Sequence, residues 1–331
     1  MRKLLVRLVA LFIALSMSTV LSSFSTADPL PRELKVDYAN FNAIALVLKK
    51  FGWLEREFQR DNLPVHWVFS EGSNQGLDLL TKGGVDFAST SAVASVLGKA
   101  KGQSIKAVYI FSHPQWAAFL VTNDSSIKTL SDLKGGKIAA TPGTDSYLFM
   151  LRALHDAGIR PSDVVIVPKP PKEGLEELQK KRVTAWVGSD YYCSQSQLER
   201  GSQEIYTKSE LLGSGYLTVT ESFAATYPDV VARVIKVYES ARKWSIRHPD
   251  DLAVICSDAW QVSLPVSQLV VSHIDFSRAI PDTQDIRYLK KIVPVLIAEN
   301  LLKRSKKSGT LIDDLIDNSF AASLINKPLL N

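Results

Sequence analysis

The sequence predicts an α/β fold organised as two lobes. Short apolar runs alternate with segments of helical periodicity, which favours parallel strands covered by helices on both faces. Three β-loop-α units follow one another from Leu34 onward, each with small polar residues after its strand. The 331-residue chain, even without its first 27 residues, is long enough for two lobes of ordinary domain size.

The three N-terminal units place polar loops at one edge of the predicted sheet. Their strands are predicted at 34–39, 65–70 and 85–90, and their helices at 42–51, after the loop 71–76, and from Ser91. In an open α/β sheet the carboxyl ends of the strands form the edge where ligands are held. Ordinary helix capping uses the same small polar residues, so the sequence leaves both roles open for Ser91.

The rest of the chain first continues this alternation and then becomes helical. Two apolar runs with no helix between them, 107–111 and 116–122, follow the third unit. We then predict strands at 137–140, 163–168, 184–188 and 203–208, helices at 172–181 and from 189–192, and an apolar segment at 213–219. C-terminal helices are predicted at 229–248, 250–262, 265–276, 283–302 and 311–320. The three between 250 and 302 have an amphipathic spacing suited to packing on the first lobe.

The most informative stretch is 127–159, which combines a glycine turn, a short strand and a helix. Apolar residues recur every three positions from 148 to 157, which indicates one apolar helix face. Thr144 and Asp145 are both candidates for the N-cap, and the helix is expected to end at Gly158. Such a helix start presents backbone N–H groups and the positive end of the helix dipole, which suit a small anion. The cap residues could instead bond only their own backbone.

The N-terminus, residues 1–27, has the pattern of a secretory signal peptide. A basic start, MRKLLVR, precedes the apolar core LVALFIALSMSTVL, and the small residues Ser25 and Ala27 follow. The apolar run is shorter than the roughly 20 residues that a spanning helix needs. Cleavage after Ala27 removes three basic residues and lowers the formal net charge from +5 to +2. The basic patch 303–307 lacks interleaved aromatic residues, so no nucleic-acid partner is expected.

The cysteines and histidines show no pattern that would hold a metal. Cys193 and Cys256 are the only cysteines, and a bridge between two lobes would lock a hinge, so we expect both to remain partly buried thiols. The five histidines are scattered without metal-ligand spacing. The sequence therefore predicts neither a metal site nor a cofactor.

The string IKTLSDLKGGKIA, followed by PGTDSYLFMLRALHDAGI, resembles the second-lobe signature of bacterial periplasmic solute-binding proteins. More narrowly, it resembles the branch that serves nitrate, sulfonate and taurine ABC importers, and the similarity extends from about Leu34 to the C-terminal helices. The resemblance implies a periplasmic binding protein-like fold of type II, with two lobes joined by a two-strand hinge. The first lobe is then 28–115 with 217–331, and the second lobe is 116–216.

The resemblance also implies a ligand site between the lobes. Its helix start, a glycine followed by small hydroxyl residues, holds the anionic head of the ligand in relatives. Relatives often carry Gly-Pro-Gln after the second strand, whereas Ser73-Asn74-Gln75 stands here, so the glutamine transfers and the proline does not. The predicted ligand-binding residues are Asn40, Phe41, Gln75, Ser91, Trp116, Gly143, Thr144, Asp145, Ser146 and Asp190.

Two of these residues keep an alternative role. Trp116 could form a wall of the cleft or pack at the hinge. Relatives commonly show a Trp-Asp-Pro-Tyr-like element near Asp190, but this chain has no proline there and has glycine at 188. Asp190 could therefore accept hydrogen bonds from an ammonium or hydroxyl group of the ligand, or it could be an N-cap that never touches ligand.

The expected function is binding, not catalysis. Hydroxyls and backbone amides converge on the cleft, while nucleophile–base pairs are missing. We expect a monomer, exported to the periplasm, that binds a small organic anion such as an aliphatic sulfonate and delivers it to an importer's membrane permease. Taurine, nitrate, and thiamine or riboflavin precursors are alternative ligands. An enzyme of pyrimidine synthesis on the same fold is a further alternative, although its chemistry calls for a histidine cluster or an active-site lysine.

Overall fold

The computed structural model describes residues 29–115, 117–304 and 310–325. The compact unit that contains the elements below begins at Pro31. The predicted signal peptide, 1–27, and Trp116 lie outside the described residues, so the predictions made for them stay predictions.

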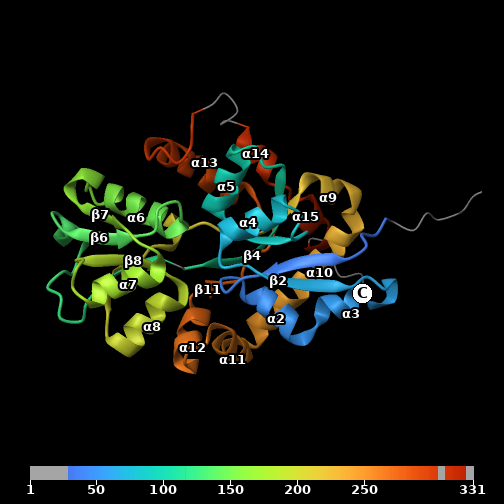
Figure 1. Cartoon of the computed structure of the whole chain (residues 1–331), viewed down its shortest axis with the longest axis horizontal. Coiled ribbons are helices and arrows are strands. Elements are labelled where there is room, and N and C mark those ends of the chain that lie inside the picture. Colours follow the sequence, from blue (N-terminus) through green and yellow to red (C-terminus); the bar gives the residue numbers. More distant parts are fainter. Residues whose placement is uncertain (1–28, 116, 305–309, 326–331) are drawn as a thin grey trace, which may run out of the picture. The chain divides into compact units, whose positions relative to one another are not determined.

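The first group of strands comes from two separate parts of the chain (Figure 1). Strands β1 (Leu34–Tyr38) and β2 (Val65–Phe69) pair in parallel, and a single bridge from Val36 to Phe87 connects β1 to the start of the next sheet. That sheet has the order β11-β4-β10-β3. Its strands are β3 (Ala88–Ser91), β4 (Ile105–Pro114), β10 (Gly215–Thr220) and β11 (Ile274–Asp275).

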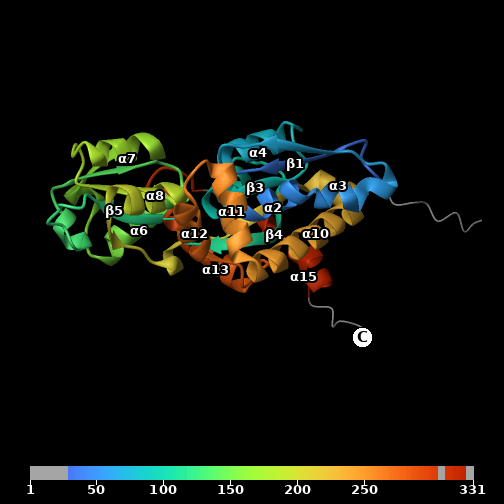
Figure 2. The ribbon, with the colours of Figure 1, turned by 90° about the horizontal axis from the view of Figure 1, so that it is seen from below.

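The second group forms one five-stranded sheet from a continuous part of the chain. Its order is β7-β6-β8-β5-β9. Figure 2 shows α7 on one face of this sheet and α6 on the other. The strands are β5 (Ala117–Val121), β6 (Lys137–Ala140), β7 (Val165–Pro168), β8 (Ala185–Ser189) and β9 (Gln203–Tyr206), and the helices are α6 (Asp145–Asp156), α7 (Pro171–Gln179) and α8 (Asp190–Arg200).

The predicted parallel sheet is only partly present, because both groups are mixed. Parallel pairs join β1 to β2 and β6 to both β7 and β8. By contrast, β10 runs antiparallel to both β3 and β4, and β5 runs antiparallel to both β8 and β9. The reason is the path of the chain: β4 and β5 carry it from the first group to the second, and β10 brings it back in the opposite direction.

Of seven helices packed around the first group, five were predicted in outline, with corrections at several ends. The N-terminal ones are α2 (Ala43–Phe51), α3 (Trp53–Phe58), α4 (Ser73–Thr81) and α5 (Ala92–Ala100), and the C-terminal ones begin with α9 (Glu221–Thr226), α10 (Pro228–Arg247) and α11 (Pro249–Trp260). The sequence prediction missed α3 and α9. Gly52 adopts a left-handed conformation, with φ of 63°, and this separates α3 from α2.

The last helices differ more from the prediction. The helix expected at 265–276 is α12 (Leu264–Ser272), because Ile274 and Asp275 pair with the edge of β4. The helix expected at 311–320 is divided into α14 (Leu311–Leu315) and α15 (Ser319–Ile325). The division follows from a tertiary contact, since the N–H of Asp317 bonds to the carbonyl of Ala107 in β4. Helix α13 (Thr283–Ala298) is close to its predicted range.

The C-terminal helices do not pack on the first group alone. Helix α11 packs on α2 of the first group, as predicted, and so does α10. By contrast, α12 packs on α8 of the second sheet, and α13 contacts both α5 and α6. Among the described helices, no single one is long and apolar enough to cross a membrane, although α11 and α12 pass that test as a pair bent by 120°. Cys193 and Cys256 are thiols, as predicted, and both are buried.

Candidate functional site

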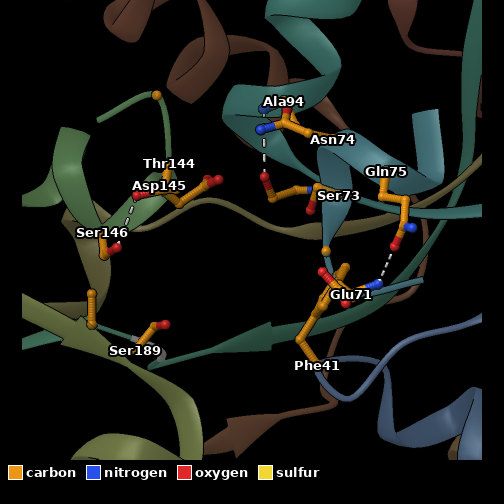
Figure 3. Close-up of a pocket in the computed structure, with 14 residues that line it drawn as sticks. Phe41, Glu71, Ser73, Asn74, Gln75, Ala94, Thr144, Asp145, Ser146 and Ser189 are labelled. Atoms are coloured by element: carbon orange, nitrogen blue, oxygen red, sulfur yellow. Dashed lines mark hydrogen bonds between the residues drawn. The ribbon is translucent and has the colours of Figure 1, made fainter. Parts of the chain in front are cut away.

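A cavity of about 380 Å³ lies where four helices begin. Figure 3 shows Thr144, Asp145, Ser146 and Ser189 on one side of it and Phe41, Glu71, Ser73, Asn74 and Gln75 on the other. The second sheet thus supplies one wall and the first group the other. The lining residues are Phe41, Glu71, Gly72, Ser73, Asn74, Gln75, Ser91, Ala94, Ala117, Gly143, Thr144, Asp145, Ser146 and Ser189.

The four helix starts come from strand ends, as expected for an α/β fold. Helix α4 follows β2, α5 follows β3, α6 follows β6 and α8 follows β8. Each start points backbone N–H groups and the positive end of a helix dipole toward the cavity region. Among the described residues that line the cavity, none is lysine, arginine or histidine. The positive partial charges at the cavity therefore belong to backbone N–H groups and not to basic side chains.

Two of these helix starts are capped by their own side chains. The hydroxyl oxygen of Ser91 accepts from the N–H of Ala94 in α5, at 3.4 Å. The hydroxyl oxygen of Thr144 accepts from the N–H of Tyr147 in α6, at 3.2 Å. Thr144 is therefore the N-cap, one of the two candidates named from the sequence.

The Thr144 hydroxyl has no proton to give to a ligand in this arrangement. It donates to the carbonyl oxygen of Thr141, at 2.6 Å, and lies 3.0 Å from the hydroxyl of Ser146. Gln75 is committed in a similar way, because its side-chain oxygen accepts from the N–H of Glu71 at 2.6 Å. Both residues line the cavity, yet these groups mainly hold its loops in shape.

The other two helix starts have no side-chain cap. Gly72 is the N-cap of α4 and Ser189 is the N-cap of α8, and neither makes a side-chain hydrogen bond to its helix. Both helices are long enough to carry a full dipole, at 9 and 11 residues. One start belongs to each wall of the cavity, so a ligand between them can accept from both.

Asp37 holds together the strand ends of the first wall. Its carboxylate accepts from the N–H and hydroxyl of Ser89, both at 2.7 Å, and from the hydroxyl of Ser70, at 2.8 Å. Asn42, the N-cap of α2, donates in turn to the Ser89 hydroxyl at 2.8 Å. Burial raises the pKa of Asp37 to about 6, while these hydrogen bonds act to lower it. The residues that follow β1 and β2 are thereby fixed to each other and to strand β3.

Asp145 spans the cavity from α6 to α5. Its Oδ1 atom accepts from the backbone N–H of Val93 in α5, at 3.3 Å. Burial raises the pKa of Asp145 to about 6, and the bonds from Ser91 and Val93 oppose that shift. An acid thus sits at the very helix start that the sequence suggested for an anion.

Seven of the ten predicted ligand-binding residues line this cavity, namely Phe41, Gln75, Ser91, Gly143, Thr144, Asp145 and Ser146. Asn40 is not in the lining, and its carbonyl accepts from the indole N–H of Trp260 at 2.8 Å. Trp116 lies outside the described residues. Asp190 is the first residue of α8, and its side chain also lies outside the described part of the structure.

The sequence reasoning missed two important parts of the lining. Residues 71–76 were assigned to a loop, from which only Gln75 was chosen, but α4 already begins at Ser73. Ser189 was identified as opening a helix and was not chosen as a site residue. In both cases the signal was present, because a small residue follows a predicted strand and precedes a helix.

No metal-binding or thiol chemistry is evident at the cavity. Within the residues that the structure describes, no group of three or more His, Cys, Asp or Glu side chains is placed to hold a metal ion. Cys193 and Cys256 are absent from the lining. Burial raises the pKa of the Cys256 thiol well above its ordinary value, which disfavours the reactive thiolate.

Sequence comparison relates the chain to sulfonate-binding proteins. A family model described as NMT1/THI5 like matches residues 47–252. A Bacillus subtilis (strain 168) protein provisionally named an aliphatic sulfonates-binding protein is 24% identical over 301 residues, which cover 87% of this chain and 87% of the relative.

Solved structures show the same fold. The periplasmic aliphatic sulphonate binding protein SsuA from Escherichia coli gives a TM-score of 0.78 at 20% identity, covering 85% of this chain and 91% of that chain. The alkanesulfonate-binding protein SsuA from Xanthomonas axonopodis pv. citri, bound to MOPS, gives a TM-score of 0.75 at 21% identity, covering 84% and 96%. The predicted periplasmic binding protein-like fold is confirmed. Since the family model spans more than half of its length, the chain belongs to the NMT1/THI5 like family.

Proposed function

We propose that the chain is the solute-binding component of an ABC importer and that its ligand is a small organic anion, an aliphatic sulfonate. The main support is the convergence of four helix starts on one cavity, two of them without side-chain caps. Backbone N–H groups at such starts bind anions without a lysine or arginine. The relatives and solved structures named above are sulfonate-binding proteins, which favours a sulfonate over other anions.

The cavity also offers apolar surface for the carbon part of such a ligand. Phe41 lies on the first wall, and Ala94 and Ala117 add small apolar side chains. The ring of Phe41 lies 6.0 Å from that of Phe111, a buried residue, so its position is supported from behind. A sulfonate head between the starts of α4 and α8, with a short alkyl group against Phe41, satisfies both parts of the lining.

The same arrangement supports capture of the ligand by closure of the two lobes. The proposed first lobe is 28–115 with 217–331, the proposed second lobe is 116–216, and the connections lie near the ends of β4 and β10. The strand groups support this division, since β5 to β9 form a sheet of their own. A ligand that bonds to α4 and α8 at once favours the closed arrangement, because only then are both helix starts within reach.

The proposal also covers where the protein acts and where it delivers its ligand. The chain is exported by a cleavable signal peptide, acts in the periplasm as a monomer, and passes its ligand to a membrane permease. Support comes from the N-terminal pattern of residues 1–27 and from relatives named as periplasmic binding proteins. The same relatives are binding proteins, which favours this role over an enzyme on the same fold.

Calorimetry with ethanesulfonate, taurine and nitrate tests the ligand class. We expect ethanesulfonate to bind more tightly than nitrate, because nitrate leaves the apolar wall empty. Native mass spectrometry of protein isolated from the periplasm identifies any ligand that co-purifies. If the folded protein binds neither sulfonate, the ligand class is wrong while the fold assignment stands.

A further inference from the structure

Asp145 is one of the two acidic residues that line the cavity. It lies at the first position of α6, lines the cavity, and has its carboxylate bonded to the N–H of Val93 at the start of α5. A carboxylate at a helix N-terminus satisfies the orphan N–H groups and the dipole there. One of the four helix starts is therefore already occupied by an internal negative charge.

The surroundings of Asp145 provide little to neutralise a further negative charge. Tyr288 of α13 lies near it, and the pKa of Tyr288 is raised mainly by burial, with a smaller contribution from Asp145. Arg152 of α6 is the nearby cation, but its guanidinium is over the ring of Tyr288 and donates to the carbonyl of Leu211 at 3.1 Å. Glu71 is the other acid in the lining, and it is exposed to solvent.

We propose that Asp145 is a specificity-determining residue that admits singly charged anions and excludes doubly charged ones such as sulfate. This inference rests on the proposed function of the cavity. The uncapped starts of α4 and α8 provide donors for one anionic group. A second negative charge would face the Asp145 carboxylate with the donors of α5 already used.

The size of the cavity makes this repulsion substantial. Asp145 lines a cavity of about 380 Å³, so an anion bound there lies close to its carboxylate, and like charges in a partly buried site repel each other. A monoanion has one charge that the Asp145 carboxylate repels, and protonation of Asp145 removes that repulsion. A dianion has two such charges. After Asp145 is protonated, the second charge of the dianion still has no hydrogen-bond donors.

The test compares Asp145→Asn with Asp156→Asn by calorimetry, using ethanesulfonate and inorganic sulfate. Asparagine keeps the shape of aspartate and an oxygen that can accept from Val93. Asp156 is at the other end of α6, outside the cavity lining, so its substitution makes the same change of formal charge as a control. We expect Asp145→Asn to improve sulfate binding relative to ethanesulfonate by tenfold or more, and Asp156→Asn to change that ratio by less than about threefold.

Proton uptake gives a second readout. Near pH 6 the parent protein should take up part of a proton when ethanesulfonate binds, because the ligand's charge favours protonated Asp145. Measurement in two buffers of different ionisation enthalpy detects that uptake, and Asp145→Asn should abolish it. An unchanged sulfate-to-sulfonate ratio in Asp145→Asn, or an equal change in Asp156→Asn, overturns the proposal.

The proposed ligand class and the proposed role of Asp145 can fail separately. If ethanesulfonate binds to no variant, the proposed ligand class is wrong, and sulfate alone then decides the role of Asp145. In that case sulfate should raise the melting temperature of Asp145→Asn and leave that of the parent unchanged. If sulfate stabilises both proteins equally, or neither of them, Asp145 does not exclude dianions.

Discussion

Replacement of Gly72 by aspartate should place a competing carboxylate at the start of α4. Gly72 is the N-cap of this helix, its φ of 175° is extended backbone open to any residue, and an added Cβ meets no atom within 4 Å. The new side chain can bond to the first-turn N–H groups of α4, as N-cap aspartates do. It would thus occupy the donors that we assign to the ligand.

Two effects should lower the affinity of Gly72→Asp for ethanesulfonate. A hydrogen bond to a charged group contributes about 1.5–3 kcal/mol, and repulsion between two charges a few ångströms apart in this site adds a similar amount. Binding of ethanesulfonate should therefore weaken by about a hundredfold or more. The free energy of unfolding should stay the same or rise by a few tenths of a kcal/mol, because aspartate is a better N-cap than glycine.

The assay is calorimetry at pH 7.5, with thermal unfolding followed in parallel. Gly72→Asn is the matched variant, since it has the same shape and can cap α4 without adding a charge. Its affinity should fall much less than that of Gly72→Asp. If Gly72→Asp binds ethanesulfonate as the parent does, the start of α4 does not hold the anion. If both variants lose the same affinity, the effect is steric and the electrostatic reasoning fails.

Substitutions in α6 are less decisive. Gly143 has a φ of 78°, so an aspartate there strains the backbone whatever it does to the ligand. Thr144→Ala removes a cap whose hydroxyl proton is given to Thr141, and its expected cost is about 1 kcal/mol of folding stability. The two uncapped helix starts therefore give cleaner tests than the start singled out from the sequence.

Three further outcomes are expected. The pKa of Asp37 is raised to about 6 in the folded protein, so the stability linked to its protonation is present at low pH and lost as the pH rises from about 4 through 6. Denaturant unfolding should show Asp37→Asn gaining about 2 kcal/mol relative to the parent between pH 4 and pH 7, and a constant difference would contradict this. Cys193 and Cys256 are buried, so a thiol reagent should modify them only when the protein unfolds; rapid labelling of the native protein would show that the structure opens there. The protein recovered from the periplasm should begin at Asp28, and an intact N-terminus found by mass spectrometry would refute the predicted cleavage.

Much of the fold could be predicted because its elements are locally encoded. The alternation of strands and helices, the N-caps Ser91 and Thr144, and most element ranges follow from short stretches of sequence. The failures share a different cause. Helix α12 ends early at a strand that pairs with β4, and the C-terminal helix is broken by a hydrogen bond to Ala107. Both depend on partners more than 100 residues away.

The sequence predicted the position of the site more accurately than it predicted which groups remain free to bind a ligand. Small residues after strands identified most of its walls, because parallel strands bring their carboxyl ends to one edge. Which donors remain available could not be predicted, since that depends on hydrogen bonds made inside the folded protein. The hydroxyl of Thr144 looks like a ligand donor in the sequence and is committed to Thr141 in the structure. Asp145 looks like a second cap and instead reaches across to Val93.

The place of β10 bears on the order in which the protein folds. This strand lies between β3 and β4, so the sheet that includes β3 and β4 stays open until residues 215–220 join it. The five strands of the second sheet all come from residues 117–206 and need no later segment to complete their order. Contacts close in sequence form before distant ones, because closing a longer loop costs more chain entropy. The second sheet should therefore consolidate first during refolding, with the ligand cavity appearing only when β10 closes the other wall.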